Sequence, residues 1–166
     1  MKTIIVLAAH GAPPTDYPAR NIGMLMAMES LEGIVKRFGF LRARQHAIDA
    51  EVRNWKRTRE NDPYKNGVDA LVEQIAAQTH YEVIAGYNEF CNPTIGQAID
   101  QAITNRADKV IVATTMLTRG GAHSEIEIRE LVHAAQKRHP SVTIVYAWPF
   151  EVERVAKLFA EEIARF

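Results

Sequence analysis

The chain has 166 residues, of which 47% are hydrophobic, and its 20 Lys and Arg balance its 20 Asp and Glu. This length supports one domain with a real core, and the balanced charge excludes a global field that would recruit nucleic acid or a membrane. The single cysteine, Cys91, excludes an internal disulfide and favours a reducing compartment, so we expect a cytoplasmic protein. The apolar run 4–9 is too short to span a bilayer.

Four apolar runs predict the strands of one sheet. They show little alternation, which is typical of strands buried on both faces. In chain order they cover 3–9, 81–87, 109–115 and 142–147.

Helical periodicity separates and follows these runs. The patterns cover 68–78, 93–103, 125–135 and 152–163. Strands that alternate with helices predict an α/β fold with a four-stranded parallel sheet flanked by helices. Ligands of such sheets bind beyond the carboxyl ends of the strands.

Residues 12–62 do not fit this alternation. The segment is rich in helix formers, so we expect two helices inserted after the first strand of a single domain that covers 1–166. Between Lys36 and Arg59 it carries eight Lys and Arg against two acids. Arg53 and Arg57 in this stretch could bind carboxylates through their guanidinium groups. A solvated helix face and a dimer contact are the alternatives.

Polar side chains follow three of the predicted strands. His10 ends the first run, Glu89 comes just beyond the second, and His123 stands where the chain turns into a helix after the third. A lone histidine here is more often a capping residue, and a lone Glu is more often a solvated acid. If the three strands are neighbours, however, these side chains converge on one rim of the sheet. Two imidazoles and a carboxylate suit a divalent first-row metal with an open coordination position.

Two nearby residues have alternative roles. Glu127 lies four residues after His123, so on a helix it shares that face and either orients the imidazole or is simply exposed. Cys91 could be a soft ligand, but a half-buried structural thiol is the more common case. We interpret the remaining histidines as surface or capping residues: His46, His80, His133 and His139.

Phosphate chemistry is a further alternative, because the turn TRGGAH at 118–123 precedes a helix and could hold an anion. The chain lacks both GxxxxGK[ST] and GxGxxG, so nucleotide binding has little support. Ala9 precedes His10, whereas histidine phosphatases need an Arg at that place.

Three motifs occur at the ends of these strands. They are VLAAHG (6–11), NEFCNPTIGQAI (88–99) and VIVATTMLTRGGAHSEI (110–126). In this order they resemble the class II tetrapyrrole chelatases, most of all the small, single-domain sirohydrochlorin cobaltochelatases of the CbiX type. The similarity covers the first strand and residues from about 63 to the end. The long 12–62 segment and the Ala12-Pro13 pair depart from the family pattern.

The resemblance implies an enzyme that inserts a divalent metal into a sirohydrochlorin-like tetrapyrrole, with Co²⁺ favoured over Ni²⁺ or Fe²⁺ and no organic cofactor. It implies that His10 is a metal ligand and proton acceptor, and that His123 is a metal ligand. It implies that Glu89 takes part in catalysis and lines the tetrapyrrole pocket. The rest of that pocket is the turn Thr118, Arg119, Gly120, Gly121, Ala122 and His123.

The resemblance also bears on assembly and on the alternatives. One such domain offers only half of a cleft, so we expect a homodimer. The alternatives are a ferrochelatase that acts on a porphyrin or siroheme precursor and a non-catalytic carrier of a tetrapyrrole or metal.

Overall fold

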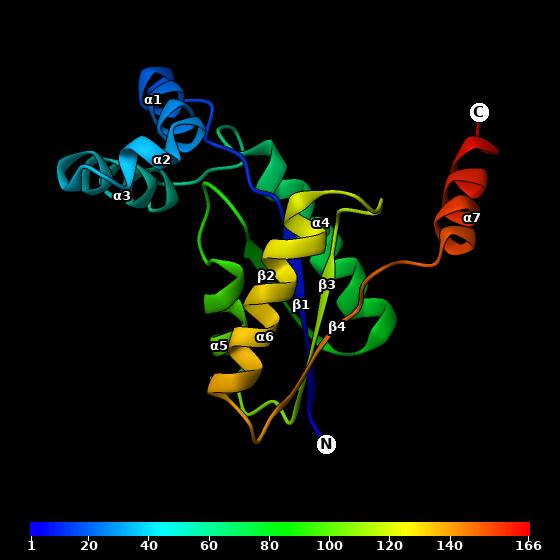
Figure 1. The fold of residues 1–166 in the computed structure, drawn as a ribbon. Coiled ribbons are helices and arrows are strands. Elements are labelled where there is room, and N and C mark those ends of the chain that lie inside the picture. The colour runs from blue at the N-terminus through cyan, green and yellow to red at the C-terminus, as the bar shows by residue number, and fades with distance from the viewer.

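A computed structural model describes residues 1–166 (Figure 1). Its four strands form one parallel sheet in the order β2-β1-β3-β4, which confirms the predicted α/β fold. The strands are β1 (Thr3–Ala9), β2 (Glu82–Tyr87), β3 (Lys109–Thr114) and β4 (Thr143–Tyr146). Because β1 lies between β2 and β3, the three strands that precede the candidate polar residues are neighbours.

The predicted helices are all present; the bounds of the last, 152–163, agree with the structure, and those of the other three differ. They are α4 (Pro63–Thr79), α5 (Ile95–Thr104), α6 (Ile128–Arg138) and α7 (Val152–Ile163), with a π-helical turn, η1 (His123–Glu127), leading into α6. α4 begins before the predicted start at 68, because Asp62 caps it by accepting from the Lys65 N–H at 2.8 Å. None of the helices is long and apolar enough to cross a membrane.

The 12–62 segment holds more than the two predicted helices. It contains α1 (Ala19–Ser30), α2 (Glu32–Val35) and α3 (Gly39–Arg53). α1 and α3 are the two long helices, and α2 is a single turn between them that begins after Leu31 leaves helical geometry. The two long helices share a small core of their own, which includes Leu25, Ile48 and Phe90. Phe90 follows β2, so it joins this core to the sheet.

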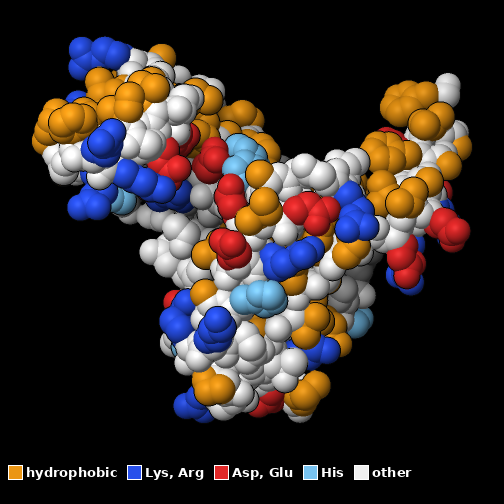
Figure 2. Space-filling model, in the orientation of Figure 1, with side chains coloured by type: hydrophobic (Ala, Val, Ile, Leu, Met, Phe, Trp, Pro, Cys, Tyr) orange, Lys and Arg blue, Asp and Glu red, His pale blue; other side chains and the backbone are white.

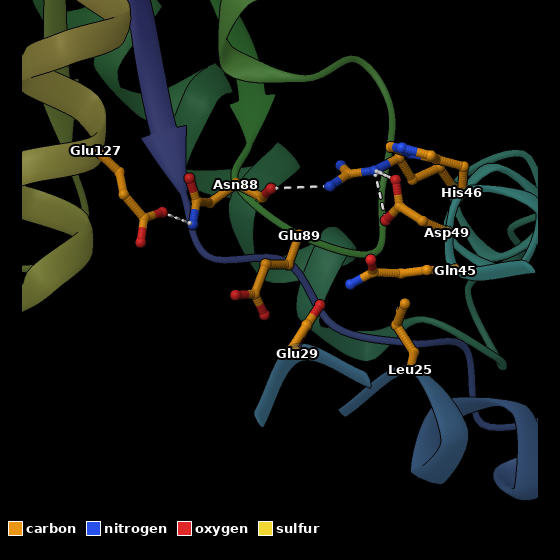
Figure 3. Close-up of a pocket in the computed structure, with 9 residues that line it drawn as sticks. Leu25, Glu29, Gln45, His46, Asp49, Asn88, Glu89 and Glu127 are labelled. Atoms are coloured by element: carbon orange, nitrogen blue, oxygen red, sulfur yellow. Dashed lines mark hydrogen bonds and ion pairs between the residues drawn. The ribbon is translucent and has the colours of Figure 1, made fainter. Parts of the chain in front are cut away.

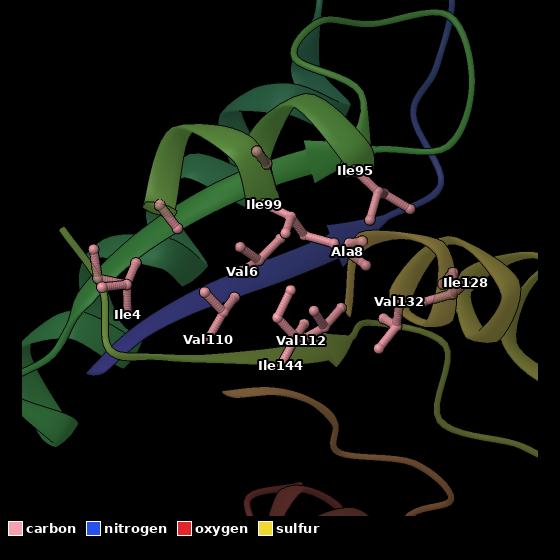
Figure 4. Close-up of a cluster of buried hydrophobic side chains, with 14 residues drawn as sticks. Ile4, Val6, Ala8, Ile95, Ile99, Val110, Val112, Ile128, Val132 and Ile144 are labelled. Atoms are coloured by element: carbon pink, nitrogen blue, oxygen red, sulfur yellow. The ribbon is translucent and has the colours of Figure 1, made fainter. Parts of the chain in front are cut away.

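The main core lies between the sheet and the pair α5 and α6 (Figure 4). It is built from alternate residues of the strands, such as Val6 and Val112, against Ile99 and Ile128 of the helices. On the other face of the sheet, α4 packs against β1 and β2. The core therefore fixes β1 from both faces and holds its carboxyl end in place.

Candidate metal centre

His10, Glu89 and His123 lie together at the carboxyl edge of the sheet, which confirms that they converge. The two oxygens of Glu89 lie 3.8 Å from His10 Nε2 and 3.6 Å from His123 Nε2. The two imidazole rings meet edge to face, with centroids 5.1 Å apart. One ligand atom from each residue lies within 4.8 Å of the others, close to the spacing that a single divalent ion bridges.

The backbone explains why the His-Gly pair ends β1. Pairing continues past the strand ends, because Asn88 N–H donates to the Ala9 carbonyl at 2.9 Å and Glu89 N–H donates to the His10 carbonyl at 2.8 Å. Gly11 then turns away with a φ of 98°. A Cβ on this residue would lie 2.0 Å from the Glu89 carbonyl oxygen. Only glycine permits this approach, which sets His10 beside Glu89.

Hydrogen bonds determine which nitrogen of each histidine faces the centre. His10 Nδ1 lies 2.9 Å from the Gly11 carbonyl oxygen, which can only accept, so Nδ1 carries a proton, and in the neutral ring Nε2 keeps its lone pair. His123 Nδ1 lies 2.9 Å from Glu127 Oε2 and 2.8 Å from the side-chain nitrogen of Asn88. In the tautomer in which Nδ1 donates to the Glu127 carboxylate, Nε2 of the neutral ring is again free. Both histidines thus present Nε2 toward Glu89, in the form that binds metals.

Of the two roles considered for Glu127 from the sequence, the contact with His123 favours orientation of the imidazole. Burial raises the pKa of the Glu127 carboxyl, but hydrogen bonds from Asn88 and His123, with the positive charge that the His123 and His10 rings carry when they are protonated, outweigh it and hold this pKa below its usual range. Asn88 Nδ2 donates to Glu127 Oε2 at 3.0 Å. The π-helical turn η1 carries both His123 and Glu127, and such turns often occur at functional sites.

The centre opens into a cleft between the sheet edge and the helices α1 and α3 (Figure 3). One cavity of about 300 Å³ adjoins a second of about 510 Å³, and Glu89 and Glu127 line both. Glu29 of α1 points across the cleft toward Glu89 (Figure 3). Burial raises the pKa of Glu29, and the negative charges of Glu89 and Asp49 add to this effect.

Sequence reasoning missed Glu29 and Asn88. No spacing in the sequence indicates that α1 lies opposite the sheet edge, so nothing in the sequence marked Glu29 as a residue of the site. Asn88 carried a weak one, because it directly precedes Glu89.

Arg57 lies within the protein. Its side chain is 12% exposed and forms an ion pair with Asp62, which is 2% exposed. The guanidinium also donates to three backbone carbonyls, those of Ala12, Val52 and Phe90. These contacts tie together the segments that leave β1, α3 and β2. They favour a structural role, and the contact of Arg57 with substrate carboxylates stays a prediction.

Arg53, on α3, is also bonded to the segment that follows β2. Its side chain pairs with Asp49 at 2.9 Å and donates to the carbonyls of Asn88 at 3.0 Å and Cys91 at 3.1 Å. Arg53 still lines the smaller cavity of the cleft, so a contact with substrate stays a prediction. Cys91 is buried, and this burial raises the pKa of its thiol, as expected for a structural cysteine.

The glycine-rich turn precedes η1 at the same edge of the sheet. Gly120 has a φ of 92°, and Arg119 pairs with Glu125 at 3.3 Å. Thr118 to Ala122 are all exposed and therefore accessible to a ligand. Thr118 and Arg119 also line a separate, apolar cavity beside α7.

The comparisons with known proteins agree with one another. A family model described as CbiX matches residues 57–165. A sirohydrochlorin ferrochelatase from Priestia megaterium is 30% identical over 76 residues, which are 45% of this chain and 28% of that protein.

Two solved structures share the fold. The sirohydrochlorin chelatase SirB from Bacillus subtilis subspecies spizizenii, in complex with cobalt, has a TM-score of 0.53 at 17% identity, over 90% of this chain and 44% of that one. SirB from Bacillus subtilis with Fe³⁺ has a TM-score of 0.51 at 17% identity, over 90% of this chain and 40% of that one. The chain thus spans less than half the length of these relatives.

Proposed function

Because this chain belongs to the CbiX family, we propose that it is a chelatase that inserts a divalent metal into a sirohydrochlorin-like tetrapyrrole. The observation that carries the proposal is the cluster of His10, Glu89 and His123, which lies at the carboxyl edge of the sheet and faces a cleft. The relatives are chelatases by name, and one SirB structure holds cobalt and another Fe³⁺.

The chemistry of insertion suits this donor set. The ion must be held by ligands that can release it, and imidazole and carboxylate release a metal more readily than a set of thiolates does. The two pyrrole N–H protons must leave as the metal enters the ring. His10 Nε2 is unprotonated in the tautomer set by Gly11, so it can accept one of them. We assign His10 as proton acceptor and metal ligand, His123 as metal ligand, and Glu89 to both the metal and the pyrrole face.

The choice of metal is part of the proposal. We favour Co²⁺, with Ni²⁺ as an alternative. Fe²⁺ is the second candidate, because one relative is named a sirohydrochlorin ferrochelatase. Binding order alone does not decide, since sites of this type bind Ni²⁺ more tightly than Co²⁺, and Co²⁺ more tightly than Fe²⁺.

The arrangement of the chain also belongs to the proposal. We infer that 12–62 is a helical insertion into a single chelatase-like domain, that two copies form a homodimer, and that the protein works in the cytoplasm. The insertion then supplies the wall of the cleft that faces the metal centre.

Turnover separates the enzyme from a carrier. Excess sirohydrochlorin and excess Co²⁺ or Fe²⁺ are mixed with a small amount of protein, and the metallated ring is followed by absorbance. A chelatase yields many equivalents of product per protein. A yield that stops at one equivalent would assign the chain as a carrier and refute the enzyme proposal.

Two substitutions at the centre should lower metal affinity by different amounts. Glu127→Gln keeps the size of the side chain but weakens the acceptor for His123 Nδ1, so we expect Co²⁺ affinity to fall about 10–100-fold. His123→Ala removes a ligand and should cost more. Isothermal titration with Co²⁺ measures both, and the exposed His133→Ala serves as control. Equal affinity in wild type and His123→Ala would remove His123 from the site.

Exposed cations of the insertion should hold the carboxylates of the substrate. Lys36 and Arg42 line the larger cavity. Exposed ion pairs contribute about 0.2–1 kcal/mol each, so Lys36→Gln with Arg42→Gln should raise KM about two- to tenfold and weaken its salt dependence. The control exchanges Lys137 and Arg106, which are exposed at the opposite edge of the sheet. An unchanged KM at low salt would contradict the prediction.

A further inference from the structure

α7 projects from the protein as an arm (Figures 1 and 2). None of its residues is buried, although Val152, Phe159 and Ile163 are large, apolar and at least 55% exposed. At helical spacing these three side chains and Val155 share one face, while Arg154, Lys157 and Glu161 occupy the opposite face. An apolar helix face of this kind is normally covered.

The sheet has an uncovered apolar strip of its own. Burial alternates along β3 and β4, so that one face of these strands is buried under α5 and α6 and the other is not. The second face carries Ile111 and Ala113, which are half-buried, and Val145, which is 40% exposed. α4 packs on β1 and β2 rather than on this strip. Parallel sheets are normally covered on both faces, so a helix is missing here.

We propose that two copies of this chain exchange α7, each helix covering the β3–β4 strip of its partner. In this structure the 147–151 segment leads α7 away from its own sheet face (Figure 1). A cavity of about 350 Å³ separates the helix from the turn that contains Leu117 and Thr118. Val152, Val155 and Phe159 line the other side of this cavity, so the apolar face of α7 is turned toward the turn without packing against it and stays open to another subunit. This proposal does not rest on the reaction that the protein catalyses.

The dimensions of helix and strip agree. The 12 residues of α7 extend about 18 Å, and the six residues of β3 extend about 20 Å. A covered Phe buries roughly 150–250 Å². In a symmetric exchange the interface forms twice. Each time it buries four apolar side chains of one helix and the strip of the partner that they cover. The total therefore exceeds the roughly 1,000 Å² that a specific interface requires. The charged face of α7 stays in water.

Cross-linking between copies tests the exchange. Val145→Cys and Phe159→Cys are made as separate single variants, mixed, unfolded and refolded together, and treated with a short bis-maleimide. Cys91 is buried and is replaced by Ala in all samples. We expect a covalent heterodimer in the mixture. If instead the double variant gives a cross-linked monomer and the mixture gives none, α7 returns to its own sheet and the proposal fails.

The mass in solution provides a second readout. Light scattering should show a dimer for the wild type and a monomer for Phe159→Glu, whose circular dichroism should retain the signal of the folded sheet and helices. The matched control, Lys157→Glu, changes the polar face of α7 and should remain dimeric. A monomeric wild type, or a Phe159→Glu variant that stays dimeric, would overturn the exchange. Either result leaves the turnover assay unaffected, although a monomeric wild type would also contradict the homodimer inferred above.

Discussion

His10→Ala is expected to slow metal insertion at least about 10²–10⁴-fold, the range that a general base contributes. In the proposed function the imidazole is both a proton acceptor and one of the metal ligands, so its loss would remove both functions. The variant should still fold, because the contacts that hold this position use the backbone: His10 N–H donates to Tyr64 Oη at 3.1 Å, and its carbonyl accepts from Glu89. Binding of the tetrapyrrole should also persist.

The measurements for this variant are single-turnover and steady-state kinetics, with tetrapyrrole binding followed by absorbance. His133→Ala is the control, because His133 is exposed on α6 and lines neither cavity of the cleft. A near-normal kcat for His10→Ala would contradict the prediction and would indicate that His10 serves only the turn after β1. Loss of tetrapyrrole binding as well would instead place His10 in the substrate pocket.

Arg57→Gln is expected to reduce the free energy of unfolding by about 3–5 kcal/mol, because it leaves Asp62 as an unpaired charge in the interior. Three backbone carbonyls lose a donor at the same time, and of these the Val52 carbonyl still accepts from the Trp55 N–H. Urea denaturation followed by circular dichroism gives the change. Arg59→Gln is the matched control, since Arg59 is exposed and belongs to the same basic stretch.

This experiment also separates the two roles of Arg57. A structural brace predicts a large loss of stability. A substrate ligand predicts normal stability with an increased KM. Normal stability of Arg57→Gln would therefore restore the interpretation drawn from the sequence.

The arrangement of the strands was accessible from the sequence, because buried parallel strands have a distinctive composition. The apolar runs located all four strands, and polar residues near the carboxyl ends of three of them singled out His10, Glu89 and His123. Strand ends are fixed by the sheet, so His10 and Glu89, which follow their strands within two residues, have nearly determined positions, whereas His123 is placed by the turn η1 that follows β3.

The direction of side chains in the 12–62 segment was not accessible. Counting charges showed an excess of Lys and Arg there, but a count does not show that Arg57 points inward while Lys36 points into the cleft. Periodicity likewise predicted α7 as a helix and did not indicate that it stands apart from the sheet. Both depend on contacts between segments that are distant in the chain.

The separate core of α1 and α3 has a consequence for how specificity can change. The floor of the cleft belongs to the sheet and its core, and the wall belongs to a second packed unit, connected through Phe90 and the Arg57 brace. Under the proposed function, substitutions in the wall would alter which ring substituents are accepted while His10, Glu89 and His123 keep their spacing. Tolerance for the macrocycle and coordination of the ion would then be independent of each other.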